Sequence, residues 1–220
     1  MNHNIAIDGP AGAGKSTIAK KIAQKRKVIY VDTGAMYRAM ALFLLRQGIG
    51  PQETEKISAK CEEADITICY ENGEQVVLLN GENVNGLIRT EEVSHMASGS
   101  SANPQVRKKL VRLQQALAAR EDVVMDGRDI GTCVLPDAAV KVYLTAGVGV
   151  RARRRYEELL ARGEVCDLSE IEKDIEERDR QDMTREISPL RQAEDAVLID
   201  SSNMSIDDVV DAVIGLCTWK

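Results

Sequence analysis

The chain has 220 residues, which suffices for one sizeable hydrophobic core with small appendages. Aromatic residues make up only 3% of it, so Val, Ile, Leu, Ala and Met must build that core. The formal net charge of −6 argues against a protein that binds nucleic acid by neutralising its phosphates.

No apolar run is long enough to span a membrane, and the N-terminal stretch MNHNIAIDG lacks the basic start and long apolar segment of a signal peptide. The five cysteines are scattered without a Cys-x-x-Cys motif, and there are only two histidines. This pattern argues against a disulfide framework or a zinc site and indicates reduced thiols. We therefore expect a cytoplasmic protein, without a membrane partner and, in the absence of coiled-coil heptads, monomeric.

Five short apolar runs predict β-strands at residues 4–8, 28–32, 122–126, 140–144 and 196–200. The runs are nearly continuous rather than alternating, which is typical of parallel strands buried on both faces. Helical patterns separate them, so the sequence predicts a three-layer α/β domain with right-handed crossovers.

Local signals mark the helix ends. A helix after the second strand is closed by Gly48, and a C-terminal helix is expected to start around Ser205. Asn103 followed by Pro104 is typical of an N-cap with proline at the first helical position. The apolar stripe of that helix consists of Val106, Leu110, Leu113 and Leu117.

Two segments interrupt the alternation of strands and helices. Residues 66–88 are predicted to form an antiparallel β insert, with turns at Asn72-Gly73 and Asn80-Gly81. Residues 151–185 are dense in charge and are predicted to be helical without a strand.

A phosphate-binding motif follows the first strand directly. The stretch GPAGAGKS, Gly9 to Ser16, has the pattern Gly-x-x-x-x-Gly-Lys-Ser between a predicted strand and a predicted helix, as the motif requires. Its backbone N–H groups and the helix N-terminus form a site for phosphate oxygens. Lys15 places a cation on the β and γ phosphates, and the Ser16 hydroxyl can bind Mg²⁺. The sequence therefore predicts a nucleoside triphosphate with Mg²⁺.

The motif leaves open what is done with the triphosphate. The guanine-binding Asn-Lys-x-Asp sequence of GTPases and the Leu-Ser-Gly-Gly signature of transport ATPases are both missing. The segment from Arg151 to Arg191 is richer in information, because it holds nine arginines and one lysine. Arginine clamps phosphates in a bidentate manner. Twelve acidic residues share the segment, so a solvated helical surface laced with ion pairs is the alternative.

Spacing favours a phosphate site over a solvated surface. Arg151, Arg154 and Arg155 fall at i, i+3 and i+4, on one helical face. We expect Ser169 and Glu172 to form a capping box that starts a second helix. An apolar stripe on that helix changes from isoleucine to charged residues, in the order Ile171, Ile175, Arg178, Asp182 and Arg185. We interpret the remaining arginines as surface charges, namely Arg153, Arg162, Arg180 and Arg191.

The chain has no convincing Ser-His-Asp or Cys-His set. If the acceptor were a sugar hydroxyl, a positioned carboxylate would help to remove its proton. A phosphate acceptor needs no base, since its second pKa is about 6. Catalysis would then consist of charge neutralisation, alignment and closure against water.

The sequence resembles a known family, the bacterial cytidylate kinases, which belong to the nucleoside monophosphate kinases. The resemblance covers nearly the whole chain. It rests on seven motifs in a specific order and spacing, DGPAGAGKST (8–17), DTGAMYR (32–38), GLIRTEEV (86–93), NPQVRKKL (103–110), DGRDIGT (126–132), PDAAVKVYL (136–144) and IEERDRQDMTR (175–185).

The resemblance implies an α/β P-loop core with a five-stranded parallel sheet, a monophosphate-binding domain enlarged by a small β insert, and a helical lid. We expect the core at residues 1–32, 105–150 and 186–220, the monophosphate-binding domain at 33–104 with the insert at about 66–88, and the lid and hinge helices at 151–185.

The resemblance also implies roles for single residues. ATP would be bound by Gly9, Pro10, Ala11, Gly12, Ala13, Gly14, Lys15, Ser16, Thr17 and Arg154. CMP would be bound by Thr33, Arg38, Arg107, Arg128, Asp129, Arg178, Asp182 and Arg185. The catalytic residues would be Lys15, Arg128, Arg185, Arg151 and Arg155, with Ser16 and Asp126 on Mg²⁺, through water in the case of the carboxylate. The family usually has Ser where this chain has Thr33, and often Gly or Ser at the position of Ser16.

The chemistry of cytosine supports the same base. Its N4 amino group donates and its N3 and O2 accept, which suits a carboxylate and an arginine such as Asp129 and Arg107. Uracil would present its O4 acceptor to that carboxylate, and a mismatch of buried polar groups discriminates strongly. Three further roles stay open: Tyr37 packs on a base or fills the core, Asp32 caps a turn, and Arg89 forms an ion pair in the small domain.

The sequence therefore predicts an ATP:CMP phosphotransferase that also accepts dCMP and binds no nucleic acid. One alternative is a kinase for another monophosphate, such as UMP or AMP. An alternative of a different class is a nucleotide-binding switch that recruits a partner, which the arginine-rich face argues against.

Overall fold

A computed structural model describes residues 3–71 and 73–219 of the chain. By its internal contacts the chain forms two compact units. The first comprises the residues up to Tyr30 and those from Glu121 onward, and the second extends from Val31 to Arg120. Each is described by itself.

The first unit is built on a five-stranded parallel sheet. Its strands are β1 (Ile5–Asp8), β2 (Ile29–Asp32), β6 (Val123–Gly127), β7 (Val140–Thr145) and β8 (Val197–Asp200), in the spatial order β2-β6-β1-β7-β8. The chain passes into the second unit in the middle of β2. The three central strands are buried almost throughout, which explains their continuous apolar sequences.

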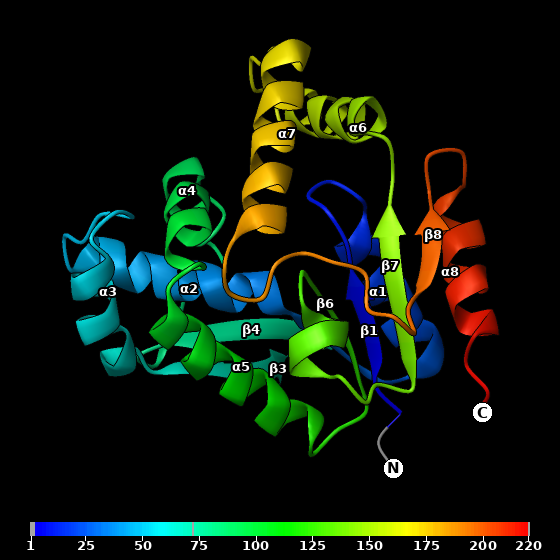
Figure 1. Ribbon diagram of the computed structural model, residues 1–220, viewed down its shortest axis with the longest axis horizontal. Helices are drawn as coiled ribbons and strands as arrows, with labels where there is room; N and C mark the ends of the chain where they lie inside the picture. The colour runs from blue at the N-terminus through cyan, green and yellow to red at the C-terminus, as the bar shows by residue number, and fades with distance from the viewer. Residues whose placement is uncertain (1–2, 72, 220) are drawn as a thin grey trace. The chain divides into compact units, whose positions relative to one another are not determined.

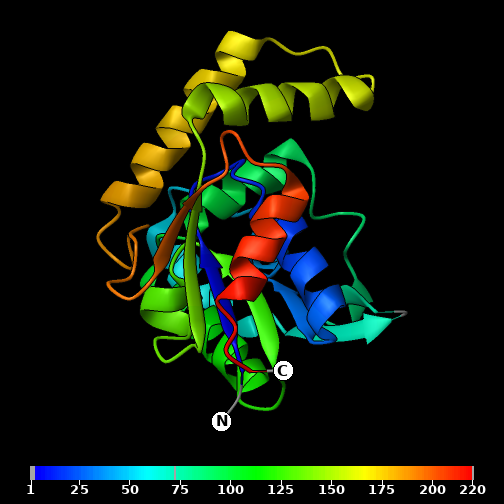
Figure 2. The same cartoon turned by 90° about the vertical axis from the view of Figure 1, so that its right-hand side faces the viewer.

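Helices α1 (Lys15–Arg26) and α8 (Ile206–Gly215) pack against each other on one face of this sheet (Figure 2). Their buried side chains share one apolar cluster with β1 and β7, which includes Ile18, Ile22, Val209 and Val213. The predicted start of α8 is confirmed, because the Ser205 hydroxyl and the Asp208 carboxylate form a capping box there.

Two helices extend beyond the carboxyl end of β7, and they pack on each other (Figure 1). They are α6 (Val148–Ala161) and α7 (Leu168–Thr184), so the predicted helical segment is confirmed. The capping box predicted at Ser169 and Glu172 is wrong. Asp167 is the N-cap of α7, because its carboxylate accepts the N–H groups of Ser169 and Glu170 and also the Ser169 hydroxyl.

The second unit combines helices with a three-stranded antiparallel sheet. Its helices are α2 (Thr33–Arg46), α3 (Thr54–Lys60), α4 (Glu91–Ser100) and α5 (Pro104–Ala118), with a 3₁₀ turn, η1 (Cys61–Glu63). Its strands are β3 (Ile66–Glu71), β4 (Glu74–Leu79) and β5 (Glu82–Asn83). The predicted insert at about 66–88 is therefore confirmed as antiparallel.

The turn signals of the insert fare differently. Asn80 and Gly81 both have positive φ, 50° and 82°, as the hairpin turn between β4 and β5 requires. The other predicted turn includes Asn72, which lies outside the described residues.

The five predicted strands and the Asn103–Pro104 helix start are confirmed within about one residue. Helix α5, which we expected in the core domain, instead belongs to the second unit. Val106 and Leu110 of its predicted stripe are fully buried in the apolar cluster of that unit, whereas Leu113 is only partly buried. None of the helices in the described residues is long and apolar enough to cross a membrane.

Candidate active site

The register of the central strands brings the phosphate-binding motif, Gly9 to Ser16, close to the DGRDIGT stretch at 126–132. In β1 and β6, Ile7 pairs with Asp126 and Asp8 pairs with Gly127. The phosphate-binding loop therefore leaves the sheet beside the stretch that contains Arg128 and Asp129. This is the carboxyl edge of a parallel sheet, where ligands of open α/β folds bind.

The loop that follows β1 has space only for glycine at its first position. Gly9 has φ of 151°, and a Cβ added there would lie 1.9 Å from the carbonyl oxygen of Leu144. At the other end of the loop, Lys15 folds back and its ammonium donates to the Pro10 carbonyl at 2.7 Å. Burial and then the Arg128 guanidinium lower the pKa of Lys15 well below its usual value. A polyanion bound here would favour the charged ammonium.

Ser16 and Asp126, the two residues that the resemblance assigns to Mg²⁺, contact each other. The Ser16 hydroxyl donates to Asp126 Oδ2 at 2.8 Å, and the Tyr30 hydroxyl donates to Oδ1 at 2.9 Å. A hydroxyl and a carboxylate fit the oxygen ligands that Mg²⁺ prefers. No group of three or more His, Cys, Asp and Glu residues suited to a metal occurs in residues 3–71 and 73–219. Water and phosphate oxygens would complete the coordination shell.

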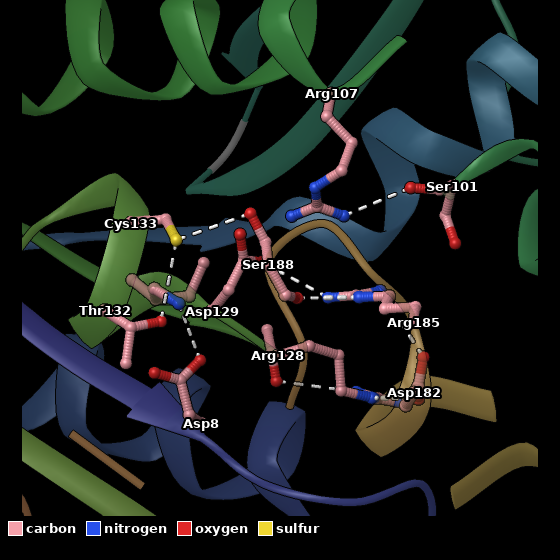
Figure 3. A network of polar contacts seen from close by, with 12 residues as sticks. Asp8, Ser101, Arg107, Arg128, Asp129, Thr132, Cys133, Asp182, Arg185 and Ser188 are labelled. Carbon is pink, nitrogen blue, oxygen red and sulfur yellow. Dashed lines mark hydrogen bonds and ion pairs between the residues drawn. The ribbon is translucent and has the colours of Figure 1, made fainter. Parts of the chain in front are cut away.

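Asp8 is a buried carboxylate that sequence reasoning missed. Its two oxygens accept the N–H groups of Ile130 and Gly131, each at 2.7 Å (Figure 3). These residues open η2 (Ile130–Val134), a single π-helical turn after the Arg128–Asp129 pair. Burial raises the pKa of Asp8 to about 6, although the two backbone hydrogen bonds oppose the rise. Asp8 thus ties the end of β1 to the turn that follows β6.

The first unit brings four predicted CMP-binding residues into one ionic network (Figure 3). Arg128 Nε donates to Asp182 Oδ2 at 2.7 Å, and Arg185 lies 3.5 Å from the other oxygen of Asp182 and 3.8 Å from Asp129. Burial opposes the charge of Arg128, but Asp182, with smaller contributions from Asp126 and Asp179, raises the pKa of the guanidinium. Burial of Asp182 would raise the pKa of its carboxyl group, but the Arg128 guanidinium and other nearby arginines lower it below the usual value. Two cations share one carboxylate here, which is an arrangement suited to binding an anion.

Asp179 is a second residue that the sequence did not reveal. We expected the buried face of α7 to continue from Ile175 to Arg178, but Arg178 is exposed and Asp179 is buried. The buried face turns toward Asp179 because its carboxylate pairs with Arg151 of α6 at 2.7 Å. Arg178 still lies close enough to influence the pKa of Lys15.

The three arginines predicted to share one face of α6 have different surroundings. Arg151 is only 3% exposed, and its guanidinium donates to the carbonyls of Ala146 and Ala11, each at 2.8 Å. The Ala11 N–H in turn donates to Asp179 at 3.3 Å. Arg154 donates to the Ser201 carbonyl at 2.7 Å, and Arg155 pairs with Glu158 on the surface. The four arginines interpreted as surface charges, Arg153, Arg162, Arg180 and Arg191, are all exposed.

In the second unit, the predicted CMP-binding residues lie in the first two turns of α2 and α5. Thr33 is the first residue of α2 and is buried, and Asp32 is the N-cap of this helix. Asp32 also pairs with Arg38 at 2.9 Å and with Arg89 at 3.5 Å. The predicted capping role of Asp32 and the predicted ion pair of Arg89 are therefore both confirmed. Arg107, near the start of α5, donates to the Ser101 carbonyl at 3.2 Å and lies over the Tyr37 ring at 5.5 Å.

A family model and the sequences of curated relatives both match this chain to cytidylate kinases. The family model for cytidylate kinase matches residues 5–218. A cytidylate kinase from Caldicellulosiruptor saccharolyticus is 52% identical over 97% of this chain and 94% of the relative. One from Carboxydothermus hydrogenoformans is 48% identical over 98% of this chain and 97% of the relative.

Solved structures show a similar fold at much lower identity. A shikimate kinase from Bacteroides thetaiotaomicron superimposes with a TM-score of 0.51 at 15% identity, covering 98% of both chains. A gluconokinase from Sinorhizobium meliloti gives a TM-score of 0.50 at 14% identity, covering 98% of this chain and 91% of the other. At this identity the likeness concerns the fold alone.

Proposed function

Because this chain belongs to the cytidylate kinase family, we propose that it transfers the γ-phosphate of ATP to CMP, giving CDP and ADP, and that dCMP is a second acceptor. The observation that carries the proposal is the pairing of Arg128 and Arg185 around Asp182 in the same unit as the phosphate-binding loop. A triphosphate site beside a cationic site for a second anion is what phosphotransfer between nucleotides requires.

On the donor side, the loop from Gly9 to Thr17 would hold the ATP phosphates with its N–H groups and with Lys15. Ser16 and Asp126 would hold Mg²⁺, the carboxylate through water, and their 2.8 Å contact fits this assignment. When bound, the metal neutralises charge on the β and γ phosphates. A polyanion would draw Lys15 away from the Pro10 carbonyl, to which it donates in this structure.

On the acceptor side, no residue has to act as a base. The CMP phosphate is largely ionised near neutral pH, so the obstacle is repulsion between two polyanions. Arg128 and Arg185 would neutralise the acceptor phosphate, and Arg38 would add a third guanidinium. The buried Nε of Arg38 has no hydrogen-bond partner among the described residues, which supports a role toward a ligand.

We assign the reading of cytosine to Asp129, Arg107 and Thr33. Asp129 would accept from the N4 amino group, and Arg107 would donate to N3 or O2. Arg178 and Asp182 would reach the ribose and the surroundings of the phosphate. Asp129, Arg178 and Asp182 belong to the first unit, and Thr33 and Arg107 belong to the second.

The domain roles follow the same proposal. Residues 33–104 would be the monophosphate-binding domain, and residues 151–185 a lid whose Arg151, Arg154 and Arg155 act on the ATP phosphates. Arg151 would act through the loop backbone, since its guanidinium donates to Ala11. We also propose that the enzyme works as a cytoplasmic monomer, a state that light scattering of the purified protein would test.

A panel of acceptors tests the proposed function. ADP release from Mg-ATP is measured with CMP, dCMP, UMP, AMP and GMP, and Lys15→Ala serves as the inactive control. We expect CMP and dCMP to be preferred over the other three. Preference for UMP or AMP would favour a different monophosphate kinase, and slow hydrolysis without stimulation by any monophosphate would favour a nucleotide-binding switch.

The same panel tests the role of Asp129. Loss of a hydrogen bond between a charged group and the base costs about 1.5–3 kcal/mol, so Asp129→Ala should lower the CMP-to-UMP preference roughly 10- to 100-fold. An unchanged ratio would mean that the base is read elsewhere. Thr132→Ala, in the same turn, is the matched control and should keep the ratio.

A further inference from the structure

The antiparallel sheet of the second unit has no part in the chemistry proposed so far, yet one of its side chains holds the backbone at the start of α2. Gln75, on β4, accepts the Asp32 N–H through Oε1 at 2.8 Å. Its Nε2 donates to the Asp32 carbonyl at 3.3 Å. The side-chain amide thus pairs with both polar backbone groups of one residue, much as a neighbouring strand would.

Asp32 is the residue on which the start of α2 depends. Its Oδ1 accepts the Ala35 N–H at 2.9 Å, and its Oδ2 accepts from Arg38 at 2.9 Å. Gly34 leaves room for this pair, because a Cβ added there would lie 3.0 Å from Arg38 Nη1 and 3.2 Å from Asp32 Oδ1. The position of Asp32 therefore fixes the first turn of α2 and the direction of the Arg38 guanidinium.

Gln75 is itself firmly held. The Asn85 side chain donates to the Gln75 carbonyl at 2.8 Å and accepts the Val77 N–H at 3.0 Å. Val77 and Leu79 anchor the same strand, since both are buried in the cluster that includes α2. Strand β4 runs alongside α2 in this unit (Figure 1). The hydrogen bonds of Gln75 therefore connect a rigid strand to the helix start.

We propose that Gln75 is a positioning residue for the acceptor nucleotide, which sets Thr33 and Arg38 through the backbone of Asp32. The inference rests on the proposed function and gives the β insert a part in it. A residue with a merely structural role would lower the stability of the unit and would not act on one substrate selectively. The two roles therefore predict different kinetics.

The test compares Gln75→Met with Glu74→Ala, an exposed neighbour on the same strand. Methionine keeps the length of the side chain and removes both hydrogen bonds. We expect KM for CMP to rise about tenfold, with KM for ATP and the melting temperature at the values of the control. Backbone hydrogen exchange at the Asp32 amide should become faster in Gln75→Met alone.

Two other outcomes would overturn the proposed role of Gln75. An unchanged KM for CMP, or an unchanged exchange rate at Asp32, overturns the role of Gln75. A joint rise of both KM values with a lower melting temperature shows a structural role and also overturns it. If Gln75→Met does not fold, Gln75→Asn, which keeps the amide but is too short to reach Asp32, replaces it with the same expectations. Failure of the unmodified enzyme to phosphorylate CMP would instead overturn the proposed function, and the two failures are thereby distinguished.

Discussion

Asp8 stands at the junction of β1 and the phosphate-binding loop, and its charge is costly. The carboxylate is 4% exposed, and its pKa of about 6 lies well above the usual 3.8, chiefly because of burial. The N–H groups of Ile130 and Gly131 favour the ionised form, and Lys15 adds a weaker favourable charge. Near neutral pH, Asp8 is therefore an ionised group whose burial is offset by the turn that it holds.

The raised pKa predicts how stability depends on pH. Between pH 3.8 and about 6 the folded state keeps the proton of Asp8 and the unfolded state has lost it, so this residue's contribution to the free energy of unfolding falls as pH rises. Relative to Asp8→Asn, the wild type should lose about 1 kcal/mol between about pH 5 and pH 7 in urea denaturation.

Asp167 supplies the control for this prediction. Hydrogen bonds from Ser169 and Glu170 lower its pKa, so its titration lies below the same pH range in both states. Asp167→Asn should therefore change the free energy of unfolding by a constant amount between about pH 5 and pH 7. A constant difference for Asp8→Asn as well would contradict the raised pKa.

At the scale of single elements, helices α6 and α7 and the phosphate-binding loop are joined by one buried ion pair. Arg151 and Asp179 contact each other, and they also hold the C=O and the N–H of Ala11. Removing one partner of a buried pair leaves an uncompensated charge, which costs about 3–5 kcal/mol when the charge is fully buried. We therefore expect this pair to hold the loop backbone in place.

Asp179→Asn should act on the donor side alone. The amide keeps the shape but loses the charge opposite Arg151, so we expect KM for ATP to rise about tenfold while KM for CMP stays near the wild-type value. Glu177→Gln is the matched control, because Glu177 pairs with Arg180 on the surface of the same helix. Equal KM values for ATP in the two variants would show that the pair does not position the loop.

The element scale also shows what the sequence could predict. Continuous apolar runs and the Gly-Lys-Ser motif are local, so the strands and the phosphate-binding loop were predictable. The pairing of β1 with β6 depends on partners more than a hundred residues apart, and no local pattern encodes it. Asp179 was missed because we extended the apolar stripe from Ile171 by seven residues, to Arg178. An α-helix has 3.6 residues per turn, so positions seven and eight residues along both lie near that face, and the ion pair with Arg151 determines which of them is buried.

For the whole molecule, the two compact units differ in how their helices are supported. The helices of the second unit share one large apolar cluster with its sheet. In contrast, the only buried apolar side chains of α6 and α7 are Ala152, Ile171 and Ile175, with partly buried neighbours around this small cluster. Few buried apolar contacts and many exposed charges mark a segment that opens at low free energy.

The last prediction concerns this segment when substrates bind. ATP and CMP together bring negative charge to the arginines of residues 151–185, which should stabilise α6 and α7 against local opening. We expect amide hydrogen exchange in 151–185 to slow with both substrates, whereas β1 and β7 should already exchange slowly without them. Lys15→Ala, measured at the same nucleotide concentrations, should show a much weaker effect because it lacks the donor-phosphate cation. Unchanged exchange in 151–185 at saturating ATP and CMP would contradict the proposed lid role. A lid has to become more ordered over the bound substrates in order to exclude water from the reacting phosphates.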